Sequence, residues 1–261
     1  KPIMHGGDYF LHLQAGEAAV DPLYERKPEY YLWRELGIRL GQEEFWLWKT
    51  LEEAYDYRLS PLGVTFKEFI ANKGYDNPPL RQRKYEERGF GTPTGKFELY
   101  STVLEELGYD PLPGYSEPLR SPVSDLGLAE NFPLTLLSGG RNRRYYHSQD
   151  RQLQSIRKRS PEPVAQINPE LGSQLGITDN DWMWIETSIG RAKFKCKYFL
   201  GLNPSVVQAE HGWWLPEDSS LDSLWRSNIN AVLDDDPDIC DPVSGNFVFR
   251  GQLCRVYKAE D

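Results

Sequence analysis

Apolar and aromatic positions in the first third of the chain recur with the spacing of helices that each bury one face. The stretch EYYLWRELGIRLG predicts a helix that ends at Gly41, and EEFWLWKTLEEAYDYRL predicts a second helix of the same kind. We expect both stripes to be packing faces, because nothing in them demands a ligand. The stripe residues are Leu32, Trp33, Leu36 and Leu40 in the first helix and Phe45, Trp48, Leu51, Tyr55 and Leu59 in the second.

Three shorter signals follow these helices. In GVTFKEFI, Thr65 and Glu68 have the spacing of a capping box, which predicts a short helix. The stretch GKFELYS is typical of a strand, and TVLEELG predicts a short helix closed by Gly108. We therefore treat residues 1–109 as a helix-rich segment.

The pattern changes to strands after residue 130. Residues 110–130 contain four prolines with little periodicity and predict a connection. Residues 131–261 form the second predicted domain, in which short apolar or alternating stretches predict strands and the strand edges need covering. These stretches are PLTLL, VAQIN, WMWIET with RAKFKCKY as a hairpin, SVVQAE and LCRVYK. The predicted class is α+β, mainly β, with a closed or partly closed barrel.

One helix within the second domain is predicted from its ends. Asn168 is placed as the N-cap residue, Pro169 follows at the first helical position, and Gly176 ends the helix.

Composition narrows the class of protein. The chain has 261 residues, a formal charge of −9 and 13% aromatic residues, which indicates a globular protein and argues against general binding of nucleic acid. No apolar run is long enough for membrane insertion, and the first residues KPIMHGGDYF suggest a processed chain or a piece of a longer one. The three cysteines have no metal-ligand or disulfide spacing, and we expect Cys196 to be buried in a strand.

The stretch SGGRNRRYYHSQDRQ, directly after PLTLL, concentrates positive charge in an acidic chain. The pair Gly139-Gly140 lets backbone N–H groups approach an anion, and Arg141, Arg143 and Arg144 add planar donors suited to phosphate. On spacing alone, a solvated basic loop explains the stretch equally well. A hydrolase triad of Ser138 or Ser148 with His147 and Asp150 is a weaker alternative, because no G-x-S-x-G turn accompanies it.

Two later stretches carry groups that suit a flat heterocycle. In EHGWWLPE, His211 and Gly212 precede two tryptophans, and in SNINAVLDDDPD the side chains of Asn228 and Asn230 can both donate and accept hydrogen bonds. Aromatic core packing is the alternative for the first stretch. We expect the acidic run Asp234 to Asp236 to be a solvated turn, since no further carboxylate spacing supports a metal.

The order of five stretches resembles the C-terminal part of molybdopterin oxidoreductases of the dimethyl sulfoxide reductase family. The stretches are TPTGKFELYS, FPLTLLSGGRNRRYYHSQ, INPELGSQLGITDNDWMWIETSIGRAKFKCKY, NPSVVQAEHGWW and SNIN. The resemblance covers essentially the whole chain and is strongest from Asn131 to Lys258. It implies a six-stranded double-psi β-barrel that binds the molybdopterin dinucleotide, preceded by a helix-rich segment of the catalytic subunit.

The resemblance also implies a cofactor and the residues that bind it. The cofactor would be a bis-molybdopterin guanine dinucleotide with molybdenum or tungsten, and this region would bind it without performing catalysis. The metal ligand and the iron–sulfur motif of the family lie in regions upstream of this one. The implied partners are the rest of the catalytic subunit and an electron-transfer subunit. The implied cofactor-binding residues are Ser138, Gly139, Gly140, Arg141, His147, Ser148, His211, Gly212 and Asn230.

Two other classes of protein stay open at this point. A free-standing module could have the barrel without the pterin, because fold does not fix function. A small hydrolase would use Ser148 and His147 and would need them within hydrogen-bond reach of each other. The stretch EHGWWLPE also resembles subgroups of the family that act on sulfur oxyanions, on hydroxylated aromatics or on small unsaturated molecules. It does not distinguish among these three subgroups.

Overall fold

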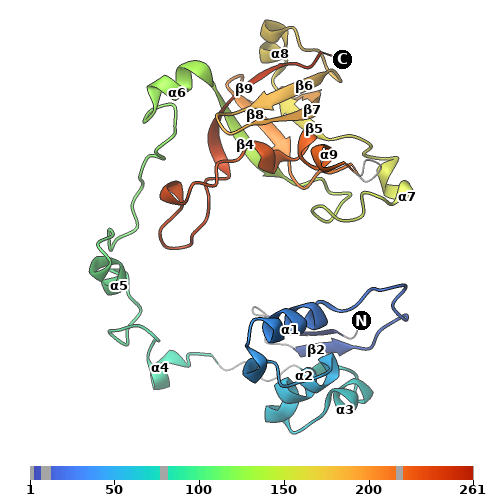
Figure 1. The fold of residues 1–261 in the computed structure, drawn as a ribbon. Helices are drawn as coiled ribbons and strands as arrows, with labels where there is room; N and C mark the ends of the chain where they lie inside the picture. Colours follow the sequence, from blue (N-terminus) through green and yellow to red (C-terminus); the bar gives the residue numbers. More distant parts are fainter. Residues whose placement is uncertain (1–2, 7–12, 77–81, 216–219, 261) are drawn as a thin grey trace. The chain divides into compact units, whose positions relative to one another are not determined.

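The computed structural model describes residues 3–6, 13–76, 82–215 and 220–260. The chain divides into two compact units, Lys1–Leu112 and Pro113–Asp261 (Figure 1). Each unit has its own hydrophobic core and is described separately.

The first unit combines short helices with a small sheet that the sequence patterns do not predict. Strand β1 (Ile3–Gly6) pairs antiparallel with β2 (Leu13–Gly16), which pairs antiparallel with β3 (Tyr75–Asp76). The helices are α1 (Glu29–Arg39), η1 (Glu43–Phe45), α2 (Leu51–Leu59), η2 (Ser60–Leu62), α3 (Phe66–Ala71), α4 (Tyr85–Arg88) and α5 (Thr102–Glu106). Leu59, Phe66 and Phe69 form the buried core of this unit.

Two capping boxes fix where α2 and α3 begin. The Thr65 side chain accepts from the Glu68 N–H while the Glu68 carboxylate accepts from the Thr65 N–H, as the sequence predicts. Thr50 and Glu53 do the same at the start of α2. The second predicted helix therefore begins only at Leu51, and the predicted stripe residues Phe45 and Trp48 lie outside it.

The predicted packing face of α1 is corrected by the structure. Leu32 is 62% exposed and Leu40 is 65% exposed, and Trp33 and Leu36 are exposed as well. Only Gly37 of this helix is buried, and a Cβ added there would lie 2.0 Å from Nε1 of Trp46. Helical periodicity correctly predicts the helix, but it does not tell which surface covers the stripe.

The strand predicted over GKFELYS is wrong, whereas the helix after it is confirmed. Residues 95–101 form bends and irregular backbone with no ladder partner. The following helix α5 is capped by the Ser101 hydroxyl and is followed by Gly108 in the left-handed region, with φ +79°. Alternation cannot produce a strand where no neighbouring strand accepts its backbone hydrogen bonds.

The second unit is a closed barrel of six strands, which confirms the predicted barrel after a helix-rich segment. The strands follow one another around the barrel in the order β4-β8-β5-β7-β6-β9 (Figure 1). The pairs β4–β8 and β5–β7 are parallel and the other four are antiparallel. The bounds are β4 (Leu134–Gly140), β5 (Val164–Ile167), β6 (Trp182–Glu186), β7 (Arg191–Tyr198), β8 (Val206–Glu210) and β9 (Arg250–Lys258).

Alternating side chains fill the barrel interior. Burial alternates along β6, β7 and β8, so every second residue of these strands enters one core. Met183, Phe194 and Val207 are fully buried members of that core. Cys196 is buried among them, as predicted, and burial raises the pKa of its thiol to about 12.

Short helices cover the barrel and the connections between its strands. These are α6 (Leu126–Asn131), α7 (Gln154–Arg157), α8 (Pro169–Leu175), α9 (Leu221–Arg226), η3 (Ile229–Val232) and η4 (Pro237–Ile239). For α8 the predicted ends are confirmed, because the Asn168 side chain accepts from the Glu170 N–H and Gly176 is left-handed. Among the described residues, no helix is long and apolar enough to cross a bilayer.

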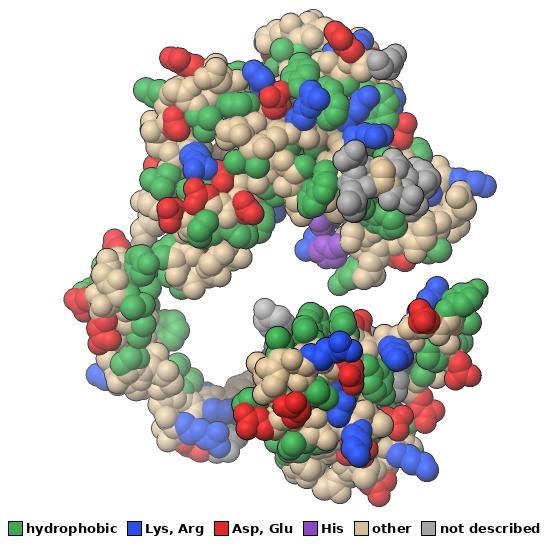
Figure 2. Space-filling view, in the orientation of Figure 1, with side chains coloured by type: hydrophobic (Ala, Val, Ile, Leu, Met, Phe, Trp, Pro, Cys, Tyr) green, Lys and Arg blue, Asp and Glu red, His purple; other side chains and the backbone are tan. Residues whose placement is uncertain are grey.

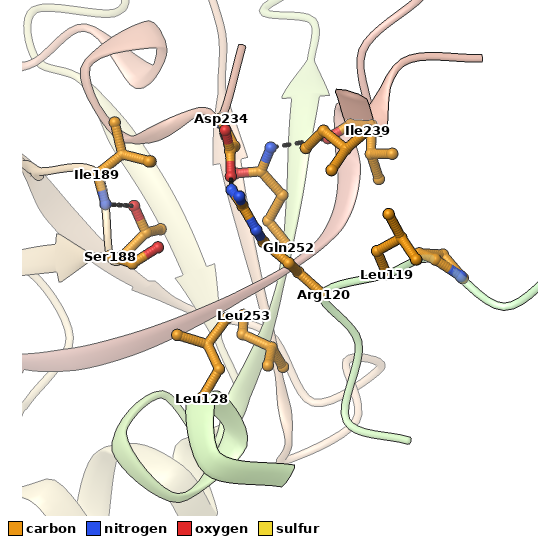
Figure 3. A pocket seen from close by; sticks show the side chains of 12 residues that line it. Leu119, Arg120, Leu128, Ser188, Ile189, Asp234, Ile239, Gln252 and Leu253 are labelled. Atoms are coloured by element: carbon orange, nitrogen blue, oxygen red, sulfur yellow. Dashed lines mark hydrogen bonds and ion pairs between the residues drawn. The ribbon is translucent and has the colours of Figure 1, made fainter. Parts of the chain in front are cut away.

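An ion pair ties the segment before the barrel to the loop after η3. Arg120 contacts the carboxylate of Asp234, which is 7% exposed, and donates to Asp236 at 3.0 Å. Figure 3 shows the Arg120 side chain directed at Asp234 beside Gln252, with Leu128 and Leu253 nearby. The expectation of a solvated turn is therefore wrong for Asp234, which is a buried counter-ion, whereas Asp235 is exposed as expected.

The same cluster reaches the start of β9. The Gln252 side chain accepts from the Asp234 N–H at 3.2 Å and donates to the Val248 carbonyl at 2.9 Å. The small cavity beside these groups measures about 50 Å³, too little for an organic ligand, so we assign it a structural role.

Candidate functional site

Four segments meet around a pocket of about 630 Å³ at one end of the barrel. Because β4 runs parallel to β8 and antiparallel to β9, the ends of β4 and β8 and the beginning of β9 lie together there. The pocket size falls within the range of about 300–1,000 Å³ that small-molecule sites occupy. The lining residues are Ser138, Gly139, Arg141, His211, Ile229, Asn230, Leu233, Phe249 and Arg250.

The end of β4 supplies the first wall of this pocket. Gly139 is left-handed, with φ +85°, and an added Cβ would meet nothing within 4 Å, so the backbone lies open there. The Ser138 side chain is buried, and its hydroxyl donates to the carbonyl of Phe249. The Gly140 carbonyl accepts from the His211 N–H at 3.1 Å, which joins the loop after β4 to the loop after β8.

Two histidines form a hydrogen-bonded pair at the mouth of the pocket. Nδ1 of His147 and Nε2 of His211 lie 2.9 Å apart, and the His147 ring is exposed. Figure 2 shows histidine side chains at the surface of the barrel unit, beside Lys and Arg side chains. His147 is held with φ +54°, an uncommon conformation for a residue other than glycine, so the loop is fixed to bring this ring to its partner.

His211 is the more enclosed ring of the pair. Burial lowers its pKa, and the neighbouring His147 and Arg141 lower it further. The carbonyls of Gly140 and Gly139 oppose that shift, yet Nδ1 of His211 is buried and makes no hydrogen bond within the described residues. An unpaired buried nitrogen in a pocket wall is a group that a bound ligand can satisfy.

Gly212 and Ser148 hold the two histidine loops against each other. A Cβ on Gly212 would lie 2.9 Å from the His147 carbonyl carbon and 3.0 Å from the Ser148 nitrogen. The Trp214 indole donates to the Ser148 carbonyl at 2.6 Å. Both residues therefore contribute through their backbones, and neither lines the pocket itself.

Asn230 reaches the pocket from η3 with an exposed side chain. Its N–H donates to the Asn228 side chain at 3.0 Å, so Asn228 caps this turn and does not enter the pocket lining. The hydroxyl of Thr187 donates to the Val232 carbonyl at 2.7 Å and attaches η3 to the β6–β7 hairpin.

Arg141 lies between two pockets and supplies positive charge to both. The second pocket measures about 340 Å³, and its lining includes Arg144, Lys197 and Glu210. Burial raises the pKa of Glu210, whereas hydrogen bonds from the Val164 N–H and the Asn142 side chain lower it. Arg143 is exposed and lines neither of these two pockets.

Sequence reasoning missed part of the pocket and one of its supports. Ile229, Leu233, Phe249 and Arg250 also line it, and only their closeness to predicted strands and to Asn230 hints at this. Arg151, the fourth arginine of the basic stretch, is 1% exposed and packs between the Tyr145 and Trp213 rings. A buried arginine has the same sequence signature as a solvated one, so the pattern could not separate them.

The geometry gives no support to a hydrolase triad. Nδ1 of His147 pairs with another histidine rather than with an acid, and the Ser138 hydroxyl donates to a backbone carbonyl. Among the described residues, no hydrogen bond joins His147 to Ser148 or to Asp150.

The lowered pKa of His211 predicts a specific pH dependence of stability. Since its folded-state pKa lies below the ordinary 6.5, the unfolded chain binds more protons, and the free energy of unfolding falls as pH drops through 6.5. Because the pKa of Glu210 is raised, Glu210 lowers the free energy of unfolding as pH rises above 4.5, which is the opposite trend. A His211 variant must therefore be compared with the unchanged protein at each pH. We expect His211→Gln to flatten the decline below pH 6.5 in urea titrations. An equal decline in both proteins would contradict this assignment.

Comparison with known proteins defines the class of the barrel. The Molydopterin dinucleotide binding domain family matches residues 135–252, which include all nine sequence-predicted site residues. Acetylene hydratase of Syntrophotalea acetylenica is 37% identical over 248 residues, covering 93% of this chain and 34% of the relative. Dopamine dehydroxylase of Eggerthella lenta is 30% identical over 267 residues, covering 95% of this chain and 25% of the relative. The solved structure of acetylene hydratase from Pelobacter acetylenicus superposes with a TM-score of 0.86 at 35% identity, covering 99% of this chain and 37% of that chain.

The barrel is a molybdopterin dinucleotide-binding domain. The chain belongs to the dimethyl sulfoxide reductase family of molybdopterin oxidoreductases and corresponds to the C-terminal region of its catalytic subunits. It spans about a third of the length of acetylene hydratase and a quarter of that of dopamine dehydroxylase. A free-standing module without pterin is not favoured by these relationships.

The residues around the pocket fit a molybdopterin cofactor. The open left-handed backbone at Gly139 suits a pyrophosphate, and Arg141 supplies the charge that such an anion needs. The unpaired Nδ1 of His211 and the exposed amide of Asn230 suit the donors and acceptors of a heterocycle.

Proposed function

We propose that this chain holds the pterin and pyrophosphate of a molybdopterin guanine dinucleotide in the pocket at the end of the barrel. The observation that carries the proposal is the meeting of Gly139, Arg141, His211 and Asn230 around one pocket from three separate segments. Molybdenum or tungsten, when bound with the pterin in the complete protein, would supply the redox chemistry. The residues of this chain bind and orient the cofactor.

The proposed roles follow from the side chains and their surroundings. Arg141 neutralises the pyrophosphate, while the N–H groups around Gly139 and Gly140 approach it without an intervening side chain. His211, supported by His147, presents Nδ1 to the heterocycle, and Asn230 hydrogen-bonds to it from the opposite segment. Ser138, Ser148 and Gly212 keep the loops in register through the contacts described above.

The complete protein would be a molybdopterin-dependent oxidoreductase of molybdenum or tungsten. The rest of the catalytic subunit would contribute the other side of the cofactor site, and an electron-transfer subunit would exchange electrons with it. The names of the two relatives describe different reactions, on acetylene and on dopamine. We therefore expect the substrate to be selected outside the pocket described here.

Replacing Arg141 by alanine tests the proposal. In the complete enzyme, we expect Arg141→Ala to lower the bound molybdopterin and guanine per chain by about tenfold, because a charged hydrogen bond is worth about 1.5–3 kcal/mol. Arg141 is exposed, so the free energy of unfolding should change by less than about 0.5 kcal/mol. Pterin fluorescence and nucleotide analysis of denatured protein measure the cofactor.

A matched control removes the same charge elsewhere. Arg159 is exposed and lines neither of the two pockets beside β4, so Arg159→Ala should leave the cofactor content unchanged. Full cofactor content in Arg141→Ala would refute the role of this residue. Tight stoichiometric binding by the chain alone would contradict the view that half of the site lies outside it.

A further inference from the structure

Arg151 is a buried cation that binds backbone carbonyls from both histidine loops. Its Nε donates to the Gly212 carbonyl at 2.7 Å. Its Nη2 donates to the His147 carbonyl at 3.2 Å and to the His211 carbonyl at 3.4 Å. One guanidinium therefore connects the loop after β4 to the loop after β8 at the backbone of each paired histidine.

Two aromatic rings hold the guanidinium in place. The Tyr145 and Trp213 ring centres lie 4.2 and 4.3 Å from Cζ of Arg151, and the two rings are perpendicular to each other. The Tyr145 hydroxyl donates to the Ser160 carbonyl at 2.7 Å, which fixes that ring in turn. Because a cation is attracted to the face of each ring, the planar guanidinium has little freedom to turn.

Arg151 is buried without a direct ion pair, and its Nη1 makes no hydrogen bond within the described residues. Burial lowers the pKa of its guanidinium and the nearby Glu210 carboxylate raises it, but no hydrogen bond joins the two side chains among the described residues. Burying a cation is costly, and carbonyl oxygens and ring faces repay this cost only in a fixed arrangement. Such an arrangement suits the fixing of backbone positions.

We propose that Arg151 is a positioning residue that sets the hydrogen bond between His147 and His211. By fixing the carbonyls of both residues, it fixes where their rings leave the backbone and hence the 2.9 Å separation of the ring nitrogens. Arg151 does not line the pocket, so it acts on the site only through the two histidines. The part of this inference that concerns the cofactor rests on the proposed function, and the part that concerns the histidine pair does not.

The test compares Arg151→Met and Arg151→Lys in the full chain. Met fills a similar volume without hydrogen-bond donors, and Lys keeps the positive charge but lacks the planar guanidinium. Side-chain spectra of ¹⁵N-labelled histidine report whether the two ring nitrogens share a hydrogen bond. We expect that signature in the unchanged protein, its loss in Arg151→Met, and its loss also in Arg151→Lys, because three carbonyls in two loops need a planar fork.

A stability control separates positioning from general loosening. Val256 is a buried member of the barrel core on β9, where it lies opposite Ile185 of β6, so Val256→Ala destabilises the unit away from the two histidine loops. We expect Val256→Ala to keep the histidine signature when it is compared with Arg151→Met at an equal loss of unfolding free energy. Loss of the signature in Val256→Ala, or its survival in Arg151→Met, overturns the proposal.

A second measurement addresses the cofactor. In the complete enzyme, Arg151→Met should lower the molybdopterin per chain by about tenfold, the effect typical of residues that orient a ligand-binding group. Arg159→Met is the charge-matched control and should leave it unchanged. If the histidine signature disappears while the cofactor content stays full, the positioning role holds and the proposed pocket is wrong. If both stay unchanged, the positioning role itself is wrong.

Discussion

Replacing Gly212 by alanine is expected to lower the free energy of unfolding by about 2–4 kcal/mol and to separate the paired histidines. Gly212 has φ +72°, and the left-handed region alone costs an L-residue about 1–2 kcal/mol. The added Cβ would also lie 2.9 Å from the His147 carbonyl carbon, a backbone atom that can move only with its loop. Urea titration measures the first effect, and histidine spectra measure the second.

Gly176 provides the matched control for this substitution. It has φ +66°, close to that of Gly212, but an added Cβ would meet nothing within 4 Å. Gly176→Ala should therefore show the backbone cost alone, about 1–2 kcal/mol, with the histidine pair intact. Equal losses for the two variants would show that the contact between the loops contributes nothing.

Replacing Arg120 by alanine is expected to cost about 2–4 kcal/mol, because it leaves the Asp234 carboxylate buried without a cation. We place the loss below the full value for a buried pair, since Arg120 is 37% exposed and water screens part of the interaction. The Asp234 N–H and the Val248 carbonyl are both bonded to Gln252, so the change also loosens the segments that carry Leu233 and Phe249. Chemical denaturation measures the loss.

Two companion variants test the cause. The double variant Arg120→Met with Asp234→Asn removes both charges and should recover most of the stability, as replacement of buried pairs by neutral groups often does. Asp236 is 36% exposed, and Asp236→Asn should cost less than about 1 kcal/mol. If the double variant is as unstable as Arg120→Ala, the unpaired carboxylate of Asp234 is not the cause of the lost stability.

The barrel could be predicted from sequence because several of its strands are short apolar or alternating stretches that turn residues separate. In β6, β7 and β8 every second residue is apolar or small and buried, and the turn and cap residues at Asn168 and Gly176 agree with that pattern. Two of the three stretches that carry the proposed site, the one after PLTLL and the one after SVVQA, also lie at the ends of predicted strands. Their meeting around one pocket is a consequence of parallel and antiparallel pairing, which a local pattern does not contain.

Other features depend on partners far away in the chain. GKFELYS has the composition of a strand but no ladder partner, whereas β2 pairs with the adjacent β1 and, across a long separation in sequence, with β3. Asp234 and Arg151 look like solvated charges in sequence, and only the contacts with Arg120 and with backbone carbonyls bury them. Local sequence predicts which groups are polar, and the tertiary fold decides which of them are dry.

The place of β9 in the barrel has a consequence for synthesis. β9 lies between β4 and β6, and its pairing of Cys254 with Leu134 joins residues 120 positions apart. Until the ribosome has released β9, the nascent domain has two uncovered strand edges, which are prone to pair with other chains. Arg250 arrives with this strand and completes the pocket wall. A ligand of the proposed pocket would therefore meet a complete pocket wall only after β9 has been translated.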